Sequence, residues 1–132
     1  MAIPNGAGGY QFSDGNNGEA LLFVQPAPTA LTAAATATAA QLASGLFTFN
    51  GTAGNLTLPT VADLEAEISS ATKVNAAFDF YVINIDATTD DVTVATATGW
   101  TLVGNMVVTE ATSGHFRARK TGDGSWTCYR VS

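Results

Sequence analysis

Short runs of alternating apolar and polar residues, each closed by turn-forming residues, recur along most of this chain. The clearest pair is 115–121 and 125–131, which the Gly-Asp-Gly sequence at 122–124 joins as a β-hairpin. Residues 78–85 are apolar on both alternating faces through their middle, which is typical of a central strand covered on both sides. Together these segments predict an all-β fold, an antiparallel β-sandwich of the jelly-roll-like type.

The middle of the chain predicts further strands and one short α-helix. Strands are expected at 30–38, 46–49 and 55–58, the first of them followed by a turn. The helix begins after Thr60, because the Thr60 side chain can cap the backbone and Asp63 completes a Thr-x-x-Asp box. Its apolar residues share one face over about ten residues, so we expect it to pack on a sheet.

An N-terminal arm, residues 1–28, is expected to precede a single domain, residues 29–132. The arm is rich in glycine and proline, and Pro26 and Pro28 favour an extended, stiff backbone where it joins the domain. Its one apolar patch consists of Leu21, Leu22, Phe23 and Val24. A long segment of this kind in a compact protein is usually disordered or functional, and we expect this one to make contacts with partners.

Composition excludes several classes of protein. Of the 132 residues 46% are hydrophobic and 12% are charged, which does not fit disorder caused by excess charge. The 23 alanines and 19 threonines suit closely packed β-layers. A net charge of −6 argues against binding to nucleic acid, and no run approaches the roughly 18 apolar residues of a membrane span. The first residues do not resemble a secretory signal, so we expect no export by that route.

Basic residues are concentrated at the C-terminus. Residues 1–116 contain ten acidic side chains and one basic one, Lys73, whereas residues 117–132 contain one acidic and four basic side chains. The four basic residues are Arg117, Arg119, Lys120 and Arg130. This asymmetry indicates contact with an acidic partner, for which another copy of the chain would qualify. Ordinary solvated strand faces are the alternative explanation.

The residues offer little for catalysis. His115, the one histidine, is expected to be exposed beside Arg117 and Arg119, with no carboxylate to orient it as a catalytic triad requires. Cys128 is expected to be a small buried hydrophobic residue. One cysteine and one histidine do not make a zinc site of the usual composition, and phosphate-binding glycine loops are absent. We therefore predict no catalytic residue, metal or cofactor.

Two weaker features each have two explanations. Asp86, Asp90 and Asp91 surround an expected hairpin turn at 87–90, where they would bind a cation weakly or act as solvated turn carboxylates. Trp100 and Trp126 lie on the apolar faces of their strands, where they would fill the core or form a platform for a carbohydrate.

Six short strings occur in order over residues 36–132. They are TAAQL at 38–42 with Gly45, Asn50-Gly51, TLPT at 57–60, FxFxxIN at 78–84, GWTLVGxM at 99–106 and FRAR at 116–119. As a set they resemble small tailed-bacteriophage virion proteins of the capsid decoration, or cement, type. The resemblance implies a non-enzymatic β-rich protein on the outer surface of the virion capsid, often a homotrimer, assembled in the host cytoplasm. Its partners would be the major capsid protein and other copies of itself, and it would tie neighbouring capsomers together.

Two alternatives from other classes stay open at this point. The first is a receptor- or glycan-binding module of a phage tail or fibre, which would require an exposed cluster of aromatic residues. The second is a hydrolytic enzyme, which would require a pocket that holds two carboxylates about 5–10 Å apart.

Overall fold

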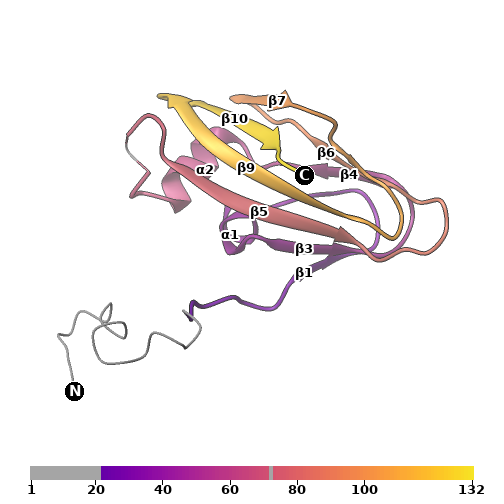
Figure 1. The fold of residues 1–132 in the computed structure, drawn as a ribbon. Helices are drawn as coiled ribbons and strands as arrows, with labels where there is room; N and C mark the ends of the chain where they lie inside the picture. The colour runs from indigo at the N-terminus through magenta and orange to yellow at the C-terminus, as the bar shows by residue number, and fades with distance from the viewer. Residues whose placement is uncertain (1–21, 72) are drawn as a thin grey trace, which may run out of the picture.

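The computed structural model describes residues 22–71 and 73–132, which form two β-sheets and two short helices (Figure 1). Leu21 and the rest of the expected arm before it lie outside the described residues. The six-stranded sheet has the order β1 (Thr29–Leu31), β3 (Leu46–Phe49), β5 (Ala77–Asn84), β9 (Ser113–Gly122), β10 (Ser125–Arg130) and β7 (Trp100–Val103). The four-stranded sheet has the order β2 (Ala35–Thr36), β4 (Gly54–Thr57), β6 (Val92–Ala95) and β8 (Val107–Val108). The prediction of a predominantly β fold is confirmed.

Both sheets are mixed, so the expectation of an antiparallel arrangement is wrong. Among the described strands, the pairs β1–β3, β3–β5, β2–β4, β4–β6 and β7–β10 are parallel, while β5–β9, β9–β10 and β6–β8 are antiparallel. The physical reason is the path of the chain. From β1 to β6 successive strands alternate between the two sheets, and strands that are two apart in sequence therefore lie side by side in the same direction.

Side chains from both sheets and from the helices form one hydrophobic core. Phe47, Phe80 and Phe116 contribute from three neighbouring strands of the larger sheet, and all three are fully buried. The Phe80 and Phe116 rings stack with centroids 5.1 Å apart, and Phe47 meets Phe80 edge-on at 6.4 Å. Leu56 and Val94 face them from the smaller sheet as members of the same core cluster.

The helix expected after Thr60 is present as α2 (Val61–Glu67). Thr60 is its N-cap, and the Thr60 hydroxyl accepts a hydrogen bond from the Asp63 amide at 3.3 Å. The helix is shorter than the ten residues expected, with Ile68 as its C-cap. Val61 and Leu64 bury the apolar face against the core.

A second helix, α1 (Ala39–Ser44), was not expected. The strand expected at 30–38 is only partly present, as β1 and the short β2. Thr38 and Gln41 form a reciprocal capping box that starts α1, and Gly45 ends it in the left-handed conformation at φ +84°. Local capping therefore outweighs the β preference of the alternating threonines.

The C-terminal hairpin, β9 and β10 joined at Gly122, is confirmed by their antiparallel register. The 87–90 turn is not a hairpin, because it links β5 to β6 in the other sheet. β5 is central in its sheet, as expected, but it is covered on one face only. Phe80 and Val82 are buried, whereas Tyr81 on the outer face is 42% exposed.

Candidate interaction surface

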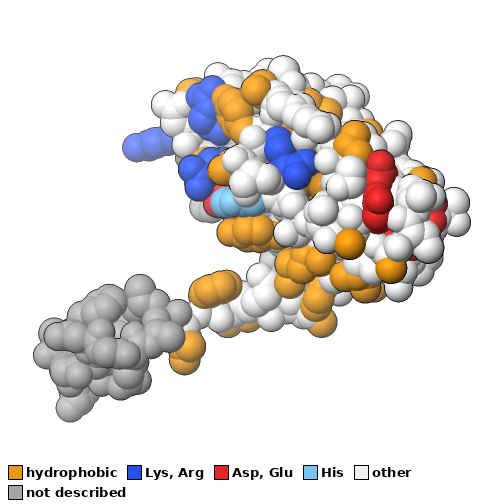
Figure 2. Space-filling model, turned by 45° about the vertical axis from the view of Figure 1, so that its right-hand side comes forward, with side chains coloured by type: hydrophobic (Ala, Val, Ile, Leu, Met, Phe, Trp, Pro, Cys, Tyr) orange, Lys and Arg blue, Asp and Glu red, His pale blue; other side chains and the backbone are white. Residues whose placement is uncertain are grey.

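The described end of the arm is apolar and almost fully exposed. Leu22, Phe23 and Val24 are 89%, 84% and 91% exposed. Gln25 fixes the base of the segment, because its Nε2 donates a hydrogen bond to the Ser44 carbonyl at 2.9 Å. Figure 2 shows the segment leaving the domain. Three consecutive large apolar side chains in water are unfavourable by about 1.5–3 kcal/mol each relative to burial, so this segment is suited to a partner.

The four basic residues of the C-terminal hairpin do not form one patch. Alternation along β9 and β10 puts Arg117 and Arg119 on the outer face of the six-stranded sheet, whereas Lys120 and Arg130 lie toward the core side. The Arg117 side chain is 53% exposed. Figure 2 shows the basic side chains next to apolar ones on the face of the molecule above the arm.

Asp79 organises the outer face of the sheet. Its carboxylate accepts hydrogen bonds from Arg117 Nε at 2.6 Å and Nη2 at 3.0 Å, and His115 Nε2 lies 2.8 Å from its Oδ2. The Arg117 hydrogen bonds, followed by that to His115, lower the pKa of Asp79 to about 2. His115 also stacks on Tyr81, with ring centroids 4.5 Å apart. The expectation that His115 has no carboxylate beside it is therefore wrong.

This arrangement differs from that of a catalytic triad. Asp79 holds a guanidinium and an imidazole at once on an open sheet face. A triad would instead use the carboxylate to orient the histidine toward a nucleophile. The sequence pattern misses Asp79 because its partners are 36 and 38 residues away, and only the β5–β9 register brings them together.

Lys120 is buried, which corrects its expected place among exposed contact residues. The residue is 5% exposed, and Nζ lies 3.1 Å both from the Ala71 carbonyl and from Glu65 Oε2. Glu65 Oε2 also accepts a hydrogen bond from Trp126 Nε1 at 3.1 Å. This bond, and then the one from Lys120, lowers the pKa of Glu65. Lys120 thus joins α2 to the hairpin inside the protein.

Arg119 and Arg130 are partly buried and have partners within the chain. Arg119 donates to the Tyr129 hydroxyl and to Asn75 Oδ1, each at 2.7 Å. Arg130 lies over the Phe116 ring at 5.3 Å and donates to the Val107 carbonyl at 2.9 Å, so it links β10 to β8. Of the four predicted basic contact residues, Lys120 is buried, while Arg117 is exposed and Arg119 and Arg130 are partly exposed.

Both tryptophans belong to the core. Trp100 is 8% exposed and donates from Nε1 to the Pro59 carbonyl at 2.7 Å, while Trp126 is 1% exposed. Their ring centroids lie 6.1 Å apart. The exposed aromatic pair that a carbohydrate platform would need is not formed by these two residues.

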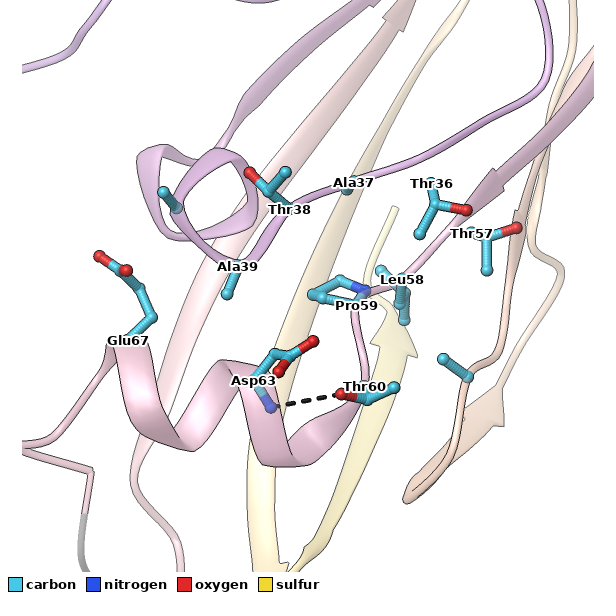
Figure 3. Close-up of a pocket in the computed structure, with 12 residues that line it drawn as sticks. Thr36, Ala37, Thr38, Ala39, Thr57, Leu58, Pro59, Thr60, Asp63 and Glu67 are labelled. Atoms are coloured by element: carbon cyan, nitrogen blue, oxygen red, sulfur yellow. Dashed lines mark hydrogen bonds between the residues drawn. The ribbon is translucent and has the colours of Figure 1, made fainter.

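A groove of about 530 Å³ opens beyond the carboxyl ends of β2, β4 and β6, between the starts of the two helices (Figure 3). Small and hydroxyl-bearing residues form most of it, and α2 contributes Asp63 and Glu67. The two carboxylates lie one turn apart on one exposed helix, on the same wall. Hydrolysis of a glycosidic bond needs carboxyl groups that flank the bond, so this pair does not have the required arrangement.

Two of the three aspartates near the 87–90 turn, Asp86 and Asp90, stabilise local structure. Asp86 Oδ1 accepts hydrogen bonds from the amide and hydroxyl of Thr88, and Asp90 Oδ1 accepts one from the Ala53 amide at 3.1 Å. Within residues 22–71 and 73–132, no three His, Cys, Asp or Glu side chains are grouped so that they could hold a metal ion. Burial raises the pKa of the Cys128 thiol to about 12, so this cysteine is a poor nucleophile.

In the part of the chain that the structure describes, neither helix is long and apolar enough to cross a membrane. Comparisons with protein-family models, with curated proteins and with solved structures found no match to this chain.

Proposed function

We propose that this chain is a non-enzymatic bacteriophage capsid decoration protein that binds the major capsid protein on the outer capsid surface. In this role it stabilises contacts between capsomers and acts as a homotrimer, on virions assembled in the host cytoplasm. The ordered strings at 38–119 that resemble such proteins support the assignment. We also propose that the two mixed sheets form a β-sandwich of the jelly-roll-like type.

The observation that carries the proposal is the exposed apolar segment at 22–24. Most aromatic side chains of the domain are buried, whereas the three side chains of this segment are 84–91% exposed. Contact with water is unfavourable for these apolar side chains unless a partner covers them. A protein that acts by attachment needs such a segment, whereas catalysis does not. Gln25, Pro26 and Pro28 set the direction in which the segment leaves the domain.

The test is binding to undecorated capsids, measured by co-sedimentation. The full chain should sediment with capsids and reach saturation. A variant with Leu22, Phe23 and Val24 all replaced by serine should bind at least about tenfold more weakly, because burial of even one such side chain corresponds to that factor.

Val74→Ser is the matched control, because Val74 is an apolar residue that is 54% exposed in the loop between α2 and β5. It should bind like the parent. Failure of the full chain to sediment with capsids would contradict the function itself. Equal binding by the triple-serine variant would contradict only the role of the arm.

A further inference from the structure

A second apolar surface lies on the outer face of the six-stranded sheet. We define the outer-face patch as Leu46, Tyr81, Ile83 and Ile85. Tyr81 is 42% exposed and Ile85 is 54% exposed, and Leu46 is the β3 residue in register with Tyr81. In the described part of the chain, no element packs over this face. Among the described residues, the arm segment and the patch are therefore both uncovered apolar surfaces.

We propose that residues 22–24 of one copy pack on the outer-face patch of a second copy. The first argument is that both surfaces are apolar and exposed, so each can cover the other. The segment is a run of three exposed apolar side chains, and the patch is a sheet face with an aromatic ring and branched aliphatic side chains. Their contact would remove both from water, which is the main driving force of association.

Charge favours this occupant of the patch. Residues 1–28 contain Asp14 and Glu19 and no lysine or arginine. The face beside the patch carries Arg117 and Arg119 against one carboxylate, Asp79, which is engaged by Arg117 and His115. An acidic and apolar arm therefore complements a basic and apolar face.

The groove between α1 and α2 is a poorer site for the arm. Asp63 and Glu67 on its wall have the same sign of charge as the arm, so the approach of the arm would be opposed. The groove also offers alanines and threonines rather than large apolar side chains.

The base of the arm indicates contact between copies rather than within one. Gln25 is bonded to the Ser44 carbonyl, two residues before Leu46, so the arm starts at the border of its own patch. Pro26 and Pro28 keep the chain extended there, and the segment points away from the domain (Figure 2). Each copy thus offers an arm and a patch. Such a head-to-tail contact can close into a ring. We take the ring to be a trimer, which rests on the proposed function.

The test places one cysteine on each surface of the same chain, Phe23→Cys with Ile85→Cys, and oxidises the protein with diamide in the absence of capsids. Buried Cys128 should not compete. We expect covalent oligomers linked between chains on non-reducing gels. A disulfide within one chain would mean that the arm folds back, and no disulfide would mean that it docks elsewhere. Either result would overturn the proposal.

The control pairs Phe23→Cys with Val74→Cys, because Val74 and Ile85 are both 54% exposed. Equal crosslinking in the control would also overturn the proposal, since random collision would then explain it. A second variant, Phe23→Ser, should weaken self-association by about 10- to 100-fold in sedimentation velocity, and unchanged association would count against the contact. Because capsids are absent, these results are independent of whether the full chain sediments with capsids. If residues 22–24 pack between copies, the triple-serine variant would bind capsids more weakly through loss of the assembled oligomer.

Discussion

Removing the Glu65 carboxylate should destabilise the domain far more than removing a carboxylate elsewhere on the same helix. In Glu65→Ala, the ammonium group of Lys120, whose side chain is 6% exposed, keeps the Ala71 carbonyl but loses the nearer of its two carboxylates, which leaves the fully exposed Asp123 at 4.0 Å. The indole N–H of Trp126 loses its acceptor. Breaking a fully buried pair costs about 3–5 kcal/mol, and the 27% exposure of Glu65 lets water replace part of it, so we expect a loss of about 2–3 kcal/mol.

The assay is equilibrium urea unfolding followed by tryptophan fluorescence, with Glu67→Ala as the control. Glu67 is exposed on the same helix, and its substitution should change the free energy of unfolding by less than about 0.5 kcal/mol. Adding Lys120→Met to Glu65→Ala should recover more than about 1 kcal/mol, because the buried charge, left with only the solvated Asp123 at 4.0 Å, is then gone. The reasoning is refuted if Glu65→Ala and Glu67→Ala are equally stable, or if the second substitution destabilises further.

Three further predictions concern single residues. The lowered pKa of Asp79 stabilises the fold above the usual carboxyl pKa near 3.8, and this contribution is lost as pH falls toward about 2. The full shift of the Asp79 pKa would correspond to about 2.4 kcal/mol of stability, and the exposure of Arg117 reduces this to about 1 kcal/mol. The acid unfolding of Asp79→Asn should therefore lack a pH-dependent contribution of about 1 kcal/mol. Gly99→Ala should cost at least about 2 kcal/mol in thermal or urea unfolding, because φ is +97° and a Cβ would lie 2.7 Å from the Val61 side chain, whereas Gly122→Ala, with open space around it, should be near neutral. Cys128 should resist Ellman's reagent at pH 8 in the native protein and react on unfolding, and fast native reaction would contradict its burial.

Alternation in the sequence identified most strands because it reports which residues face the core. It did not report which strands are neighbours. β3 and β4 read as consecutive strands about the turn at Asn50, yet they belong to different sheets, and the parallel pairs follow from that crossing. The start of α1 had a readable signal in Thr38 and Gln41, which form a capping box, but the alternating threonines before it favoured a strand.

The same limit applies to the interaction surface. The exposed arm segment could be anticipated from its apolar residues between turn-rich and proline-rich stretches. Whether each basic side chain is buried or exposed could not be anticipated, because this depends on contacts with residues that are distant in the sequence. Lys120 is buried by Glu65 and Ala71, 55 and 49 residues away, whereas Arg117 stays on the outer face beside Asp79. Alternation in the sequence showed which residues of β9 share a face. It did not show which of the two faces a partner could reach.

The most direct test of the central claim is quantitative mass spectrometry of virus particles purified from the cells that produce this chain. Particles should be separated from host cytoplasm by density-gradient centrifugation before the measurement. We predict that the chain copurifies with the major capsid protein at a fixed ratio through the gradient. Its absence from particles, with the chain left in the soluble fraction, would contradict a role in capsid decoration.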